Sequence, residues 1–157
     1  MAGHTRAGRA EVVDELIWTA PRAVADTVLF QQAVADRLGL NLTDVKCLAP
    51  LADGGRSTIR EIAERLGLTH GAVTRTVDRL EEAGYVRRDP DPTDGRKIFI
   101  VGIPERMREV SALYEGMAQA WRELLAGCTT AELEFLRGLL RQMREITAVE
   151  IAKLRHR

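Results

Sequence analysis

The chain has 157 residues, of which 45% are hydrophobic and 4% aromatic, and its 23 basic residues balance 23 acidic ones. This length predicts one compact domain, or one domain with a docked helical module, and allows a substantial core. No apolar run is long enough to span a bilayer and no apolar signal core follows the first residues, so we expect a cytoplasmic protein. A net charge of zero argues against a purely non-specific nucleic-acid binder, which is usually basic.

Two helical segments are predicted in the first third of the chain. Apolar residues recur at helical spacing over residues 8–39, and Pro21 should kink or divide this helix. The segment Asn41–Asp44 has the composition of a helix start. The second helix should run from there to about Asp53, with Pro50 in an irregular last turn.

The central part of the chain predicts a short helix, a tight turn and a second helix. Thr58 and Glu61 have the spacing of a capping box, so the first helix should begin there. Gly67 should end it. Thr69 is a suitable N-cap for the second helix, and Gly84 is a natural stop after it.

A β-hairpin is predicted directly after the second of these helices. Its strands should cover residues 85–89 and 97–101, and residues 90–95 between them have the composition of a turn. This order of elements is a winged helix-turn-helix, which lays one helix in the DNA major groove and reaches the backbone or minor groove with the hairpin. The predicted fold class is therefore mainly α with a small β-hairpin wing, joined to a helical dimerisation domain.

The second helix supplies most of the candidate DNA-binding residues. Val73, Val77 and Leu80 step by four and three residues, so they should form its inward stripe. Arg79 is expected on the outward face, and Arg75 could make a bidentate contact to a guanine edge. The other candidates lie in the first turns, where free amides and the helix dipole favour phosphate: Thr69, His70, Gly71 and Thr74.

The wing should add cations at its tip. Asp94 is expected to brace Arg96 in an extended pose, beside Lys97, so that the guanidinium can reach the narrow minor groove. Arg87 and Arg88 are neighbours on the first strand and therefore point to opposite faces. Only one of these two can face a duplex, and the pattern leaves open which.

Two long helices are predicted after the wing. Pro104 suits the first turn of a helix that continues to about Ala126, and Thr129 with Glu132 forms a second capping box for a final helix. Six apolar residues of the former step by three or four, which is the spacing of a heptad seam and indicates a dimerisation surface: Met107, Val110, Tyr114, Met117, Trp121 and Leu124.

Nothing in the sequence predicts an enzyme, a metal site or a cofactor. Cys47 and Cys128 lack metal or disulfide spacing, and His4, His70 and His156 lack ligand spacing. We interpret Cys47 as a small buried apolar residue. Redox sensing by a cysteine, which would require a lowered pKa and solvent access, stays an alternative. No nucleophile–base set or phosphate loop is present.

The segment Leu68–Arg88, followed by Asp91–Lys97 and preceded by Leu40–Leu48, resembles the MarR (multiple antibiotic resistance regulator) family. The resemblance implies a homodimeric repressor, less often an activator, that binds pseudo-palindromic DNA and pairs through its terminal helices. Many members release DNA when a phenolic or aromatic acid binds, so a small-molecule effector is expected. The chain departs from the family pattern at Gly95, where a second arginine is common, and at Gly71-Ala72, where many relatives carry hydroxyl side chains.

The predicted organisation is a dimerisation segment at 1–40, a winged helix-turn-helix at 41–103 and dimerisation helices at 104–157. Two functions remain open. Residues 56–100 hold nine basic and eight acidic side chains, a near neutrality that favours a winged-helix protein-interaction module without DNA binding. The Arg96–Lys97 pair and the long flanking helices favour a dimeric DNA-binding regulator.

Overall fold

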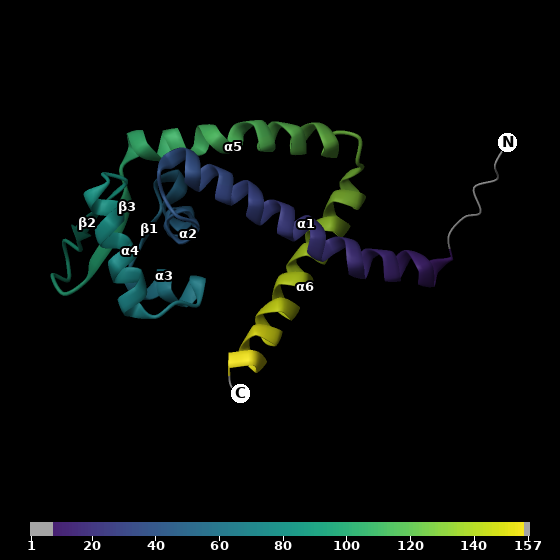
Figure 1. Cartoon of the computed structure of the whole chain (residues 1–157), viewed down its shortest axis with the longest axis horizontal. Coiled ribbons are helices and arrows are strands. Elements are labelled where there is room, and N and C mark those ends of the chain that lie inside the picture. The colour runs from purple at the N-terminus through teal and green to yellow at the C-terminus, as the bar shows by residue number, and fades with distance from the viewer. Residues whose placement is uncertain (1–7, 156–157) are drawn as a thin grey trace. The chain divides into compact units, whose positions relative to one another are not determined.

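The computed structural model describes residues 8–155. The chain divides into two compact units, Met1–Leu113 and Tyr114–Arg157. It is mainly helical with one small antiparallel sheet, which confirms the predicted fold class (Figure 1). In chain order the elements are α1 (Arg9–Leu38), α2 (Leu42–Leu48), the 3-10 helix η1 (Ala49–Gly54), β1 (Arg56–Ser57), α3 (Ile59–Leu66), α4 (His70–Glu82), β2 (Val86–Pro90), β3 (Ile98–Gly102), α5 (Pro104–Leu125) and α6 (Thr130–Arg155).

The first helix covers its predicted segment without a break, from Arg9 to Leu38. The prediction that Pro21 divides it is wrong, because α1 continues through this residue. Proline in a helix interior removes one backbone hydrogen bond. The other backbone hydrogen bonds of this 30-residue helix remain, and they keep it continuous. The helix ends at Gly39, whose φ of 67° lets its N–H bond back to the carbonyls of Ala35 and Asp36.

The second helix is shorter than predicted. It begins where the composition of Asn41–Asp44 indicated a helix start, and there Asn41 and Asp44 form a reciprocal capping box. However, α2 ends at Leu48 instead of near Asp53, and the chain tightens into η1 with Pro50 in its first turn. A proline in a first turn gives up no hydrogen bond, since those amides have no intrahelical acceptor.

The predicted helix-turn-helix is confirmed with its caps. Thr58 and Glu61 close a capping box on α3, and Gly67 ends this helix with a φ of 65°. The hydroxyl of Thr69 accepts from the amide of Ala72 at 3.2 Å and so caps α4.

The sheet has one strand that the sequence does not predict. Strands β2 and β3 pair antiparallel one residue later than expected, with Arg88 opposite Ile100. The additional strand β1 pairs with β3, so the strand order is β1-β3-β2. Its two residues are too few to show the alternation by which strands are recognised. The loop joining β2 to β3 projects beyond the helices of this unit (Figure 1).

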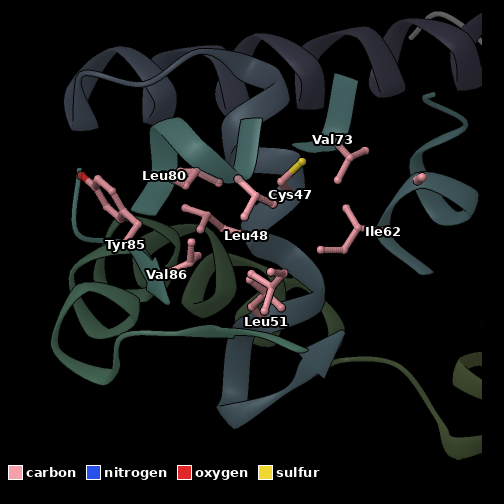
Figure 2. Close-up of a cluster of buried hydrophobic side chains, with 11 residues drawn as sticks. Cys47, Leu48, Leu51, Ile62, Val73, Leu80, Tyr85 and Val86 are labelled. Atoms are coloured by element: carbon pink, nitrogen blue, oxygen red, sulfur yellow. The ribbon is translucent and has the colours of Figure 1, made fainter. Parts of the chain in front are cut away.

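One hydrophobic core joins α2, η1, α3, α4 and the sheet. The predicted inward stripe of α4 is confirmed, because Val73, Val77 and Leu80 are at most 1% exposed. Figure 2 shows labelled side chains from these elements converging on a common centre. The cluster consists of Cys47, Leu48, Leu51, Ile62, Ala63, Val73, Val77, Leu80, Tyr85, Val86 and Ile100.

The second compact unit contains the end of α5 and all of α6. Thr129 and Glu132 form the predicted capping box, with 2.8 Å between the amide of Thr129 and Oε2 of Glu132. Over residues 130–154 of α6, no side chain is buried. Among the residues placed in the structure, no helix is long and apolar enough to cross a membrane.

The burial of Cys47 predicts a chemically quiet thiol. Burial, with a smaller effect of the Asp44 carboxylate, raises the pKa of Cys47 to about 11. Because only the thiolate attacks, we expect Cys47 in a C128A variant to react with a small disulfide reagent at pH 8 far more slowly than it does after unfolding in denaturant. Absorbance of the released thiol measures both rates. Cys128, which is exposed, is the matched control in a C47A variant. Equal native rates for the two cysteines would contradict the expectation.

Candidate nucleic-acid interface

The first turns of α4 present the predicted contact residues to solvent. His70, Gly71 and Arg75 are exposed, and Thr74 is partly exposed. The Thr74 hydroxyl donates to the carbonyl of His70 at 2.9 Å, which leaves its methyl and its lone pairs facing outward. A Cβ placed on Gly71 would meet nothing closer than the Arg75 guanidinium at 4.0 Å. The backbone at Gly71 is therefore open to close approach by a ligand.

The start of α4 also offers donors to an anion. Its N-cap Thr69 uses its hydroxyl on the Ala72 amide and its carbonyl on the amides of Ala72 and Val73. The two preceding amides, of His70 and Gly71, have no acceptor within residues 8–155. Free amides at a helix start, with the positive end of the helix dipole, suit a phosphate oxygen.

A groove of about 620 Å³ joins the helix-turn-helix to the wing. His70 of α4 and the wing residues Arg96 and Lys97 line it together, so the tertiary structure brings these three predicted residues to one surface. Three cations and two carboxylates lie along it, as well as His70. The complete lining is Thr58, Ile59, Arg60, Glu61, Glu64, His70, Arg96, Lys97 and Ile98.

Two cations of this region were not predicted. Arg60 lines the groove from α3, where it pairs with Glu64 at 2.9 Å. Arg56 of β1 lies 4.2 Å from the centre of the Phe99 ring, and the Lys97 ammonium lies 4.8 Å from the same ring. Cations are attracted to an aromatic face, so Phe99 is a common contact of Arg56 and Lys97. Arg60 could have been predicted from the sequence, because it lies on the outward face of an amphipathic helix. Arg56 could not, because its position depends on the unpredicted strand β1.

The wing turn is stabilised by aspartates that bond the backbone. Asp91 Oδ1 accepts from the amide and the hydroxyl of Thr93, and these bonds lower the pKa of the Asp91 carboxyl below its usual value. The prediction that Asp94 braces the Arg96 side chain needs correction: its Oδ1 accepts from the backbone amide of Arg96 at 3.1 Å. Asp94 therefore fixes the turn and leaves the Arg96 guanidinium without a partner among the described residues.

The structure distinguishes the two arginines of β2. Arg88 turns toward α4, where its guanidinium donates to Glu81 and, at 2.6 Å, to Asp78. Its amide also donates to Glu81 at 3.0 Å. Arg87 takes the exposed face and pairs with Asp89 at 2.9 Å. Arg88 thus fastens the wing to α4. Of the two arginines, Arg87 is the one whose charge faces solvent.

Arg79 is not grouped with the other candidates. Its Nη2 lies 2.6 Å from Oδ1 of Asp44, a carboxylate on α2, and 3.3 Å from the hydroxyl of Thr76. The remaining members of the predicted set either line the groove or lie on the first turns of α4 and in the wing turn. In the part of the chain that the structure places, no three His, Cys, Asp or Glu residues could hold a metal ion.

Known proteins share this architecture. A family model described as MarR family matches residues 38–97. The helix-turn-helix-type transcriptional regulator YcgE of Bacillus subtilis (strain 168) is 34% identical over 151 residues, which are 96% of this chain and 98% of that protein. A MarR family protein from Bacillus stearothermophilus superimposes with a TM-score of 0.68 at 19% identity, covering 90% of this chain and 99% of the other.

A DNA complex is among the similar solved structures. The structure of reduced AbfR bound to DNA has a TM-score of 0.55 at 18% identity and covers 89% of this chain and 96% of that one. Such low identity shows a shared fold. The family model and the full-length similarity to YcgE go further, and both describe regulators rather than enzymes, as the sequence predicted. The chain belongs to the MarR family of DNA-binding, helix-turn-helix transcription regulators.

Proposed function

We propose that this regulator works as a homodimer that reads a pseudo-palindromic operator, with α4 of each copy in the major groove and each wing on the flanking backbone or minor groove. The groove shared by His70, Arg96 and Lys97 is the observation that supports this most. It brings the start of α4 and the wing cations to one surface, as a helix in the groove with a wing beside it requires.

Exposed apolar helix faces support the homodimer. Large apolar side chains on α1 and α6 are open to water, and Trp18 and Leu154 are 71% and 73% exposed. Large apolar side chains left open to water mark an interaction site where they gather on one helix face. A groove of about 440 Å³ is lined by Leu125 at the end of α5 and by three leucines and three arginines of α6, and apolar side chains of a second copy could pack there.

The predicted seam on α5 divides into two parts. Met107 and Val110 pack against the core of the winged domain, and Tyr114 is partly buried. Met117, Trp121 and Leu124 are exposed, with Leu124 at 68%. We infer that the later half of the seam is the part that contacts the partner.

We further propose that the dimer represses transcription and that a small phenolic or aromatic acid releases it from DNA, as the resemblance implies. The experiment that tests the whole proposal selects bound sites from genomic fragments and then titrates the best site by gel shift at two salt concentrations. A twofold-symmetric site, bound more weakly at higher salt and released by such an acid, is the expected result. Random fragments bound as tightly as selected ones would contradict it.

Arg96→Ala should weaken binding to every DNA sequence, because the wing cation is expected to contact the DNA without reading bases. Loss of one phosphate contact should lower the slope of log affinity against log salt by about 1. Gel-shift titrations over a salt series measure the slope. Arg122→Ala removes the same charge from an exposed α5 position and is the control. An unchanged slope in Arg96→Ala would remove Arg96 from the DNA contacts.

Arg75→Ala should relax preference at one base pair in each half-site. A lost bidentate base contact costs about 1–3 kcal/mol on the specific site. The measurement compares affinities for the selected operator, for operators changed at single positions and for random DNA. Affinity for random DNA should fall much less than affinity for the operator. Similar losses on both would assign Arg75 to the phosphates.

Met117→Asp should separate the subunits, since it places a charge on the exposed half of the seam. Light scattering should then give a mass of 17.4 kDa, that of one chain, instead of twice this value. Ala112→Asp adds the same charge to α5 five residues earlier, at a position that the heptad places opposite the seam. This control should stay dimeric. A dimeric Met117→Asp variant would place the interface elsewhere.

A further inference from the structure

Arg79 lies on the recognition helix one turn after Arg75, yet its guanidinium is already engaged. Nη2 is 2.6 Å from Oδ1 of Asp44 on α2, and the same nitrogen donates to the hydroxyl of Thr76 at 3.3 Å. The partner is 35 residues away in the chain. This is therefore a tertiary contact between α2 and α4, unlike the exposed ion pairs within single helices.

The two partners differ strongly in burial. The Asp44 side chain is 5% exposed and the Arg79 side chain 50%. A buried carboxylate needs a cation or several donors, because leaving it unpaired is strongly unfavourable. Within residues 8–155, the one other donor to this carboxylate is the amide of Asn41, at 3.2 Å from Oδ2. Moving Arg79 out to a phosphate would strip Asp44 of its one charged partner.

A second contact joins the same regions. The hydroxyl of Tyr85, just beyond the end of α4, donates to the carbonyl of Leu38 at 3.2 Å. Leu38 is the last residue of α1, and the capping box of α2 follows three residues later. The later half of α4 is thus held to α2 through Arg79, and the chain just after α4 is held to the end of α1 through Tyr85, whereas the first turns of α4 are free to face a ligand.

We propose that Arg79 is a positioning residue: paired with Asp44, it sets how α4 presents Thr74 and Arg75, and it does not contact DNA. The α1–α2 junction then determines the orientation of the recognition helix. This inference rests on the proposed reading of DNA by α4, and it removes one residue from the predicted contact set.

The decisive variant is Asp44→Asn. Asparagine keeps the shape of the side chain and an oxygen for the capping bond, but it releases the Arg79 guanidinium. If Arg79 positions α4, affinity for the operator should fall on the order of tenfold, the size of a typical coupling between linked sites, and the salt slope should stay that of the wild type. If Arg79 contacts a phosphate, Asp44→Asn should leave affinity unchanged or raise it.

Arg79→Gln gives an independent readout. A positioning role predicts a loss on the operator with an unchanged salt slope, whereas a phosphate contact predicts a slope lowered by about 1. In the double variant Asp44→Asn/Arg79→Gln, a positioning pair predicts no loss beyond that of the larger single variant. Additive losses would overturn the proposal.

Controls separate this test from folding and from the proposed function. Glu115→Gln removes an exposed carboxylate paired with Arg122 on α5 and should leave affinity unchanged. Stoichiometric titration at high protein concentration gives the active fraction, so partial unfolding is not counted as weaker binding. Should Asp44→Asn not fold, the salt slope of Arg79→Gln decides alone. Failure of the wild type to select an operator would contradict the proposed function, whereas wild-type slopes and affinities in both single variants would contradict only the role of Arg79.

Discussion

The fold depends first on burying one face of α4. Val73, Val77 and Leu80 are almost completely excluded from water, and burying each such side chain contributes about 1.5–3 kcal/mol. Because a helix is rigid, fixing this stripe in the core also fixes the direction of the opposite face. His70 and Arg75 are exposed as a consequence of what their neighbours bury, and the proposed DNA-binding surface is the outer face of the same helix.

Charge balance in the winged domain has a structural explanation. Asp44 neutralises Arg79, and Asp78 with Glu81 neutralises Arg88. These acidic residues secure α4 to α2 and to the wing. The pairs do not change the near neutrality of residues 56–100, because seven basic and six acidic side chains of that range remain outside them. Membership of a DNA-binding family and a nearly neutral composition are compatible because DNA contacts depend on where the cations lie, and Arg60, Arg96 and Lys97 line one groove. The family, not the charge count, decides against the interaction module.

Because of such pairs, the two ends of α4 differ: the later end is held by tertiary contacts and the first turns are open to solvent. Its later half is tied by Arg79, Arg88 and the hydroxyl of Tyr85, and its first turns end in free amides and exposed polar side chains. Reading a base edge requires a side chain held at a defined angle. The anchored later half of α4 would hold the side chains at a defined angle, and its open first turns would leave room for phosphate and bases.

Sequence alone determined the local features of this protein. The capping boxes of α3 and α6, the glycine stops and the inward stripe of α4 follow from interactions within four residues, which spacing reveals directly. Tertiary structure decided the rest: Arg79 and Arg88 were given partners 35 and ten residues away, and β1 formed because β3 was beside it. Asp94 bonds backbone instead of side chain, and α1 passes through Pro21. The spacing of apolar residues shows which face of an element is buried. It does not show which residue far along the chain will lie beside that element.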